Sequence, residues 1–468
     1  MKNRVFEIFK EITAIPRGSG NMKPVADYCV EFAKSNSLDY IRDEADNVII
    51  FKKANSKSTE PIIMQGHLDM VCQQTADSKH DFNISGPEIV IDGDFIKAKD
   101  TTLGADNGIA VAIILAILES KDLIHPPIEA VFTVDEEVGM LGATALDTTP
   151  LKSKRMINLD SEEDDTVTVS CAGGSDFIIK LPATAEKSGE NKITVTLFGL
   201  KGGHSGVEID KGRVNANILA GRILNHLYNT IDFRIASING GERSNAITPQ
   251  CEIILSCDNV RLISEAESYL NLIKKEISAR EPNFDFSINI SGKAEKSFSK
   301  ELTEKLIFLL VNAPNGIMEM SAEIEGLVET SLNLGILKTD VNGIFADFSL
   351  RSNKLSAIDF LEERLCSLAK AISAEYETVG HYPPWEYKPD SILQEIYVNT
   401  YEEIYGKAPK IAAIHAGLEC GVFDSKITDL SAIAVGPQMY DVHTVNERLS
   451  VSSTEKFTEL IVKVLEKL

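Results

Sequence analysis

His67 and Asp69 are the first residues of the chain whose types and spacing could do chemistry. They lie in Met64-Gln65-Gly66-His67-Leu68-Asp69-Met70, directly after an apolar run that predicts a strand. Because alternate residues of a strand point to the same side, both side chains should leave the strand end together. A neutral imidazole can bind a metal ion, and a nearby carboxylate can orient it or accept a proton. Alone, such a pair is more often structural than catalytic.

Other acidic residues follow further predicted strands. The strand 130–134 runs into Asp135-Glu136-Glu137-Val138-Gly139, and the strand 156–159 ends in Asp160. Asp106, in Gly104-Ala105-Asp106-Asn107-Gly108, precedes an apolar segment that predicts a buried helix. A helix cap for Asp106 and a solvated loop for the three acids are structural alternatives. Their repeated placement instead favours a site, because ligands of α/β sheets bind at the carboxyl ends of strands.

Length, charge and cysteine content limit the class of protein. The chain has 468 residues, so we expect two or three domains. Its formal net charge of −23 argues against nucleic acid or an anionic membrane as a partner. The amphipathic N-terminus lacks the apolar core of a signal peptide, and the run 109–118 is too short to span a bilayer. The 7 cysteines form no C-x-x-C pair, so a cytoplasmic protein with reduced thiols is predicted.

A change of pattern near Lys192 indicates a second domain. Strands and helices alternate as β-α-β-β-α-β, at 193–199, 215–228, 231–238, 251–256, 264–277 and the strand after it. This order predicts an α+β layer. A weaker echo between 301 and 375 suggests an internal duplication of the layer, as a hypothesis. We therefore expect 1–188 and 383–468 to form one α/β domain, with 189–382 inserted as another.

Taken in order and with a late histidine, His443, these motifs resemble the M20 family of co-catalytic zinc peptidases. Gly202-Gly203-His204-Ser205-Gly206 and His415-Ala416-Gly417-Leu418-Glu419-Cys420-Gly421 are similar to its aminoacyl-histidine dipeptidase branch. The resemblance covers essentially the whole chain. It implies an α/β/α catalytic domain with an inserted α+β lid domain, which is the division expected above.

The resemblance also implies a role for each acid and histidine. The implied metal ligands are Asp106 bridging two ions, His67 and Asp160 on one of them, and Glu137 and His443 on the other. Asp69 would hold the imidazole of His67, and Glu136 would act as general base and acid. Three ligating carboxylates offset most of the charge of two divalent ions, which explains how the acids can crowd together. Imidazole and carboxylate ligands without thiolate suit zinc, with cobalt or manganese as alternatives.

Four further residues match positions that contact substrate in the family. His204 and Asn245 correspond to lid residues that contact the substrate carbonyl and the reaction intermediate. Arg351 corresponds to an arginine that binds a C-terminal carboxylate, a task that suits a guanidinium fork. Glu419 is a plausible partner for the free amine of the substrate. A turn or a surface ion pair is the structural alternative for each of them.

The resulting prediction is a cytoplasmic dizinc dipeptidase that cleaves dipeptides with free termini, of the type Xaa-His and including carnosine-like substrates. One rival is an amidohydrolase of the same fold acting on N-acyl amino acids, whose substrates carry no charged amine for Glu419. A second rival is a catalytically silent binding protein on the same scaffold. The oligomeric state stays open, with a homodimer as one alternative. No G-x-S-x-G elbow, P-loop or G-x-G-x-x-G motif indicates another chemistry.

Overall fold

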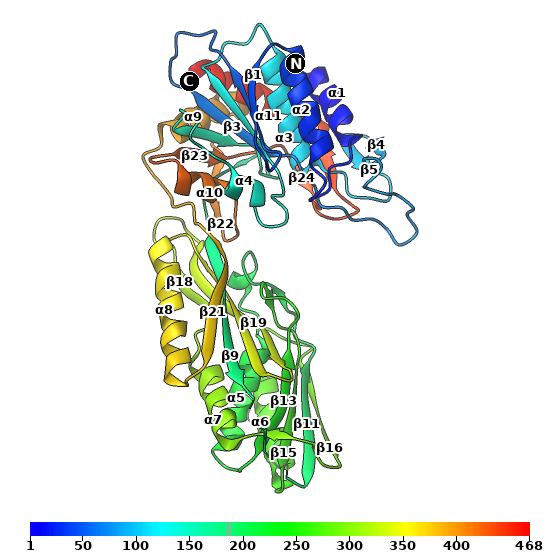
Figure 1. Ribbon diagram of the computed structural model, residues 1–468, viewed down its shortest axis with the longest axis vertical. Coiled ribbons are helices and arrows are strands. Elements are labelled where there is room, and N and C mark those ends of the chain that lie inside the picture. The colour runs from blue at the N-terminus through cyan, green and yellow to red at the C-terminus, as the bar shows by residue number, and fades with distance from the viewer. Residues whose placement is uncertain (184, 187–188) are drawn as a thin grey trace. The chain divides into compact units, whose positions relative to one another are not determined.

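The computed structural model describes residues 1–183, 185–186 and 189–468 (Figure 1). The chain divides into two compact units. The first unit consists of Met1–Cys171, Trp385–Ala413 and Leu418–Leu468. The second unit consists of Ala172–Pro384 and Ile414–Gly417. Within the described part of the chain, no helix combines the length and apolar character that crossing a membrane requires.

The first unit is built on an eight-stranded mixed sheet with the order β1-β2-β6-β3-β7-β23-β8-β22. Its strands are β1 (Asp39–Arg42), β2 (Val48–Lys52), β3 (Ile62–His67), β6 (Ile128–Thr133), β7 (Arg155–Asn158), β8 (Thr166–Cys171), β22 (Lys410–Ile414) and β23 (Ser431–Ala434). The four strands β6, β3, β7 and β23 are parallel. Every residue of β3 and β6 is buried, as expected for strands covered on both faces.

Helices and a small sheet complete the first unit. Its helices are α1 (Lys2–Thr13), α2 (Lys23–Ser35), α3 (Ala105–Glu119), α4 (Leu141–Ala145), α9 (Ile392–Tyr405), α10 (Glu419–Lys426) and α11 (Val451–Lys467). The helix α3 is apolar on all sides because it packs between α1 and β3. The small sheet has the order β24 (Met439–Tyr440), β25 (Arg448–Ser450), β5 (Phe95–Ala98) and β4 (Ile89–Asp92). Its β4–β5 hairpin turns at Gly93, which has a positive φ and follows Asp92, the Asp-Gly pair that is typical of such turns.

The register of the parallel strands brings their carboxyl ends to one edge of the sheet. His67, the last residue of β3, lies opposite Thr133 at the end of β6. Asn158, which ends β7, is paired with Gln65 of β3 and with Ala434 of β23. The acidic motifs that follow these strands therefore begin at the same edge, which confirms the prediction from the strand ends.

The second unit is an antiparallel sheet covered by helices. Its nine strands have the order β16-β11-β15-β13-β19-β20-β9-β21, with β18 paired to β19. The bounds are β9 (Gly173–Pro182), β11 (Asn191–Phe198), β13 (Arg234–Gly240), β15 (Cys251–Cys257), β16 (Asp285–Ser291), β18 (Gly316–Met320), β19 (Val328–Thr339), β20 (Gly343–Ser352) and β21 (Glu375–Tyr382). Shorter elements are β10 (Ala185–Glu186), β12 (Gly203–His204), β14 (Ala246–Ile247), β17 (Ser297–Phe298) and the 3₁₀ turn Ile209–Lys211.

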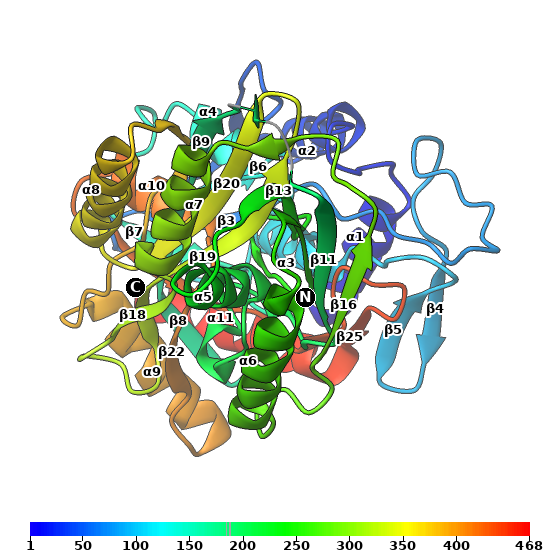
Figure 2. The same ribbon diagram turned by 90° about the horizontal axis from the view of Figure 1, so that it is seen from below.

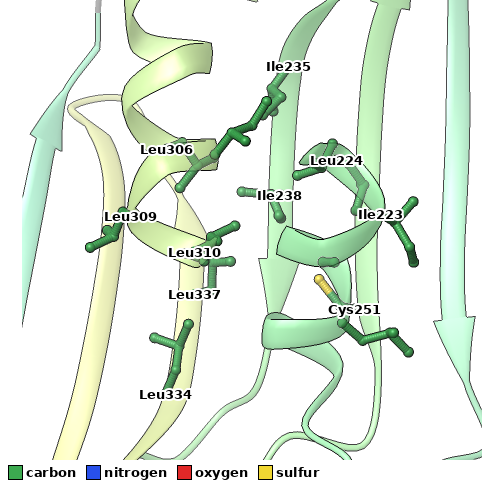
Figure 3. Close-up of a cluster of buried hydrophobic side chains, with 14 of the residues drawn as sticks. Ile223, Leu224, Ile235, Ile238, Cys251, Leu306, Leu309, Leu310, Leu334 and Leu337 are labelled. Atoms are coloured by element: carbon green, nitrogen blue, oxygen red, sulfur yellow. The ribbon is translucent and has the colours of Figure 1, made fainter. Parts of the chain in front are cut away.

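Four helices pack against one face of this sheet, as Figure 2 shows. They are α5 (Ala216–Tyr228), α6 (Arg261–Ile277), α7 (Lys300–Asn312) and α8 (Leu355–Ala371). Side chains from α5, α7, β13, β15 and β19 interlock in the core between them (Figure 3). In β20, Phe348 and Leu350 belong to this core, so the alternate residues Asp347, Ser349 and Arg351 lie on the opposite, helix-free face.

The unit boundaries differ from those expected. The chain enters the second unit after Cys171, because β9 pairs with β20 and β21 of that unit's sheet. The expected boundary at residue 188 lies outside the described residues. The segment 301–375, in which a weaker echo of the layer was expected, contains α8, which ends at Ala371, and the strand β21 follows this helix. The mixed α/β fold agrees with the prediction, whereas the internal duplication stays a hypothesis.

Candidate active site

Two histidines and three carboxylates meet at the carboxyl edge of the parallel strands in the first unit. His67 Nε2 lies 3.0 Å from Asp106 Oδ1 and 3.6 Å from Asp160 Oδ1. The other oxygen of Asp106, Oδ2, lies 3.1 Å from His443 Nε2. That same nitrogen is 2.9 Å from Glu137 Oε1. Asp106 therefore stands between two pairs, each made of one imidazole and one further carboxylate.

The three carboxylates of this cluster lie close enough together that positive charge between them would stabilise their ionised forms. Burial would lower the pKa of His67, but Asp160 and Asp106 raise it well above its ordinary value. Hydrogen bonds with Asp106 and Glu137 raise the pKa of His443 to about 11. Burial raises the pKa of Asp160. His67 is buried and His443 is exposed, and the three carboxylates between them are partly buried. Imidazole nitrogens and carboxylate oxygens, with no thiolate among them, form a donor set that fits divalent metal ions.

Asp69 connects the ring of His67 to the acidic loop after β6. Its Oδ1 lies 3.4 Å from His67 Nδ1, which favours the tautomer that carries the proton on Nδ1. The same carboxylate accepts the backbone N–H of Glu136 at 3.0 Å and of Glu137 at 3.2 Å. Ser19 Oγ donates a further bond of 2.8 Å. Asp69 is fully buried and makes none of the contacts of a bridging ligand, so its position fits the predicted orienting role.

Glu136 and Glu137 are neighbours in sequence but differ in their surroundings. Glu137 contacts His443, whereas the Glu136 carboxyl has no such histidine contact among the described residues. Burial raises the pKa of Glu136 well above its ordinary value, and the nearby acids Asp160 and Glu419 add to this effect. A buried carboxyl that readily holds a proton beside a group of acids is suited to proton transfer.

Asp106 does not cap α3. The residue that precedes the helix as its N-cap is Gly104, and both oxygens of Asp106 contact histidines instead. Asn107 fixes the segment from the other side: its Oδ1 accepts the backbone N–H of His67 at 3.2 Å, and its Nδ2 donates to the Leu159 carbonyl at 2.9 Å. Asn107 thus ties the ends of β3 and β7 to the segment that carries Asp106.

Two buried residues that the sequence analysis did not single out also position this segment. The carboxylate of Glu447 accepts four backbone N–H groups, those of Leu103 (2.7 Å), Gly104 (2.9 Å), Ala105 (2.8 Å) and Asp106 (3.3 Å). Arg17 donates from Nη1 to the carbonyls of Leu68 and Asp69, both at 3.0 Å, and from Nη2 to the Gly104 carbonyl. The unpaired N–H groups that begin every helix were the available signal for such an acceptor.

Glu419 lies at the start of α10 and is fully buried in the first unit. Its Oε2 accepts hydrogen bonds from Gln65 Nε2 at 2.5 Å and Thr133 Oγ1 at 2.7 Å. Its Oε1 has no hydrogen-bond partner among the residues that the structure describes. Burial, with a contribution from Asp160, raises the pKa of Glu419 to about 7. Glu419 therefore keeps one acceptor oxygen free beside the ends of β3 and β6.

The other three predicted substrate-binding residues belong to the second unit. His204 Nδ1 accepts the backbone N–H groups of Gly206 at 3.0 Å and Val207 at 3.2 Å, so the neutral ring carries its proton on Nε2. Burial and the nearby Arg351 guanidinium lower the pKa of His204. Asn245 and Arg351 line one cavity of about 460 Å³. The structure thus brings these residues together within the second unit.

His415 is a further member of this group. Its Nε2 lies 2.7 Å from Ser331 Oγ, on the face of the sheet that carries Arg351. Burial, Arg351 and His204 lower the pKa of His415 to about 3, so the ring is neutral. The sequence analysis used His415 only as part of a motif, whereas the structure places it as a buried support beside Arg351 and His204.

Comparison with known proteins identifies the family. Residues 63–467 match the family described as Peptidase family M20/M25/M40. The chain belongs to this family. It is 34% identical to the Cytosol non-specific dipeptidase of Escherichia coli (strain K12), over 99% of this chain and 97% of that protein. The predicted membership of the M20 family is confirmed.

Solved structures of other peptidases agree with this assignment. The Aminoacylhistidine Dipeptidase from Vibrio alginolyticus superposes with a TM-score of 0.93 at 36% identity, covering 99% of this chain and 96% of that one. A tripeptidase from Staphylococcus aureus superposes with a TM-score of 0.57 at 15% identity, covering 100% and 98% of the two chains, and shows the shared fold alone. The roles of individual residues in this M20 peptidase rest on the geometry above and stay predictions.

Proposed function

We propose that this M20 peptidase is a metal-dependent dipeptidase that hydrolyses dipeptides with free termini, of the type Xaa-His. The observation that carries the proposal is the position of Asp106: one oxygen contacts His67, whose Nε2 also lies near Asp160, and the other oxygen contacts His443. A carboxylate shared in this way is the arrangement that a two-metal hydrolase needs. Relatives named as dipeptidases over nearly the whole chain support the substrate class.

Two divalent ions, zinc first and cobalt or manganese as alternatives, would be held by the five residues of this cluster. Asp106 would bridge, with His67 and Asp160 on one side and Glu137 and His443 on the other. When bound, such ions lower the pKa of a water between them and stabilise charge on the attacked carbonyl. The remaining chemistry is the transfer of a proton.

Glu136 is the group that we assign to proton transfer. It accepts a proton from the attacking water and delivers it to the nitrogen of the leaving amine. Asp69 keeps it in place, because the Asp69 carboxylate holds the backbone N–H of Glu136 and contacts the ring of His67. Burial of the Glu136 carboxyl limits competing exchange with bulk water.

Each end of the dipeptide has a candidate partner. The Arg351 fork would bind the C-terminal carboxylate, and the Nε2–H of His204 would donate to the carbonyl oxygen, with Asn245 as a second contact. The free oxygen of Glu419 would accept a hydrogen bond from the substrate amine. An N-acylated amino acid has no charged amine to offer this buried carboxylate.

A substrate panel tests the proposal directly. Purified enzyme with zinc restored should hydrolyse alanyl-histidine and β-alanyl-histidine, and should hydrolyse N-acetyl-histidine at least about a hundredfold more slowly, as expected when a buried charged group is left unpaired. Glu419→Gln should lower kcat/KM for the dipeptides and narrow this difference. Preferred hydrolysis of N-acetyl-histidine would make the enzyme an amidohydrolase, and hydrolysis of neither class would overturn the proposed function.

A further inference from the structure

The cavity beside Arg351 contains an acidic side chain that the proposed reaction does not use. Asp347, Ser349 and Arg351 follow one another at alternate positions along the helix-free face of β20. Asp176, on the neighbouring strand β9, is paired with Ser349 and also lines the cavity. The cavity thus has the Arg351 guanidinium at one end. The Asp176 carboxylate lies on the neighbouring strand, two residues along from the residue that pairs with Arg351.

The register fixes the separation between these two charges. Arg351 is paired with Gly174, so Asp176 is its diagonal neighbour on β9. Diagonal neighbours on adjacent strands lie about 7–8 Å apart, and long side chains reach across that distance. A single amino-acid residue can span the same distance between its carboxylate and the far end of its side chain. The cavity of about 460 Å³ has room for such a residue.

Both charged groups retain hydrogen-bonding capacity toward a ligand. Arg351 is only 8% exposed, and it donates from Nη1 to Tyr382 Oη at 2.9 Å. Within the described part of the chain, its Nε has no hydrogen-bond partner. Asp176 Oδ2 accepts a bond of 2.9 Å from Ser244 Oγ. A carboxylate offers about four acceptor positions, so Asp176 can accept further N–H donors. Glu242 and Arg243, which also line the cavity, are exposed to solvent and therefore screened.

We propose that Asp176 is a specificity residue that selects histidine at the C-terminal position of the dipeptide, by accepting a hydrogen bond from the imidazole N–H while Arg351 holds the carboxylate. The inference rests on the proposed function, and it assigns to Asp176 the preference for dipeptides that end in histidine. A phenylalanine ring has a comparable shape but no N–H donor, and it would leave the carboxylate without compensation.

The test compares alanyl-histidine with alanyl-phenylalanine for the zinc-loaded enzyme and for Asp176→Asn. The amide keeps an oxygen for Ser244 Oγ but carries no charge. The wild type should prefer alanyl-histidine, and the variant should lose about tenfold in kcat/KM for that substrate alone, the effect expected for one charged hydrogen bond. The matched control is Asp285→Asn, which removes a half-exposed acid on β16 of the same sheet. It should leave the ratio of kcat/KM for alanyl-histidine to that for alanyl-phenylalanine unchanged.

Three outcomes would overturn the inference: an unchanged ratio in Asp176→Asn, an equal loss for both substrates, or a wild type without preference for histidine. Each of them requires that dipeptides are hydrolysed, so they are separate from failure of the proposed function, in which the wild type cleaves neither dipeptide. Circular dichroism of Asp176→Asn, expected to match that of the wild type, confirms that the variant is folded.

Discussion

The two oxygens of Asp106 face different histidines: Oδ1 lies 3.0 Å from His67 Nε2, and Oδ2 lies 3.1 Å from His443 Nε2. One carboxylate therefore belongs to two half-sites. The half-sites come from strand ends and loops that are far apart in the sequence, and their common point is the segment before α3. The contacts of Asn107, Arg17 and Glu447 hold that segment, so residues other than the proposed ligands maintain much of the geometry of the cluster.

His67 and Asp69 should respond differently to truncation. His67→Ala removes a proposed ligand, so metal content should fall. Asp69→Ala keeps the ligands but releases the imidazole and the backbone of Glu136, and losses for such orienting residues are about 10–100-fold in activity or affinity. Metal content after gel filtration and kcat for alanyl-histidine distinguish the two. Equal loss of metal in both variants would make Asp69 a ligand.

Glu447→Ala should disturb the site although Glu447 touches no proposed ligand side chain. The substitution leaves the four N–H groups of Leu103–Asp106 without their acceptor, so Asp106 loses its fixed backbone. We expect metal affinity to fall by about tenfold or more, as measured by competition with a fluorescent chelator. Glu455→Ala, on the exposed side of α11, is the control. Unchanged affinity in Glu447→Ala would mean that the helix start holds its position without the carboxylate.

Arg351→Lys should separate charge from geometry in carboxylate binding. Lysine keeps the charge but cannot form the bidentate fork, so KM for alanyl-histidine should rise by about tenfold while kcat changes less. Alanyl-histidine amide, which has no C-terminal carboxylate, supplies the comparison: both enzymes should hydrolyse it with similar kcat/KM. A variant that loses activity equally on acid and amide would assign Arg351 a structural role.

Asp347 should make the second unit less stable as pH rises. Burial and the nearby Asp176 carboxylate raise the pKa of Asp347 from 3.8 to about 7. Between these values the unfolded chain binds fewer protons than the folded one, so stability falls as pH rises and the loss is complete above about pH 7. Asp347→Asn removes this loss, and the Tm advantage of the variant should widen by at least about 2 °C from about pH 5 to about pH 8. A Tm difference between variant and wild type that stays constant from about pH 5 to about pH 8 would mean that the pKa of Asp347 is not raised.

The sequence predicted the parts of the site that depend on local pattern. Strand ends follow from short apolar runs, and parallel strands share an edge, so the placement of His67, Glu136, Glu137 and Asp160 could be expected. The helix 109–118 could be expected from its uniform apolar character, which the structure explains by burial between α1 and β3. These features can be predicted because each depends only on residues that lie within a few positions of the motif.

Features that depend on distant partners were not predicted. No strand was predicted over 166–182, where the chain forms β8 and β9, so the boundary between the units was expected too late. Glu447 and Arg17 act on backbone groups 341–344 and 51–87 residues away, and no spacing in the sequence reveals such contacts. Asp176 lies in the same unassigned stretch, so its place beside Arg351 emerged only from the strand register.

The most direct measurement of the central claim is the metal content and turnover of Glu136→Gln. The amide cannot accept the proton of the attacking water, while all five proposed ligands stay in place. We expect two divalent ions per chain, as in the wild type, and a loss of kcat for alanyl-histidine of at least about 10³-fold, near the upper range for general acid–base catalysis. Near-normal turnover would contradict the assignment of Glu136, and fewer than two ions in the wild-type chain would contradict the shared role of Asp106.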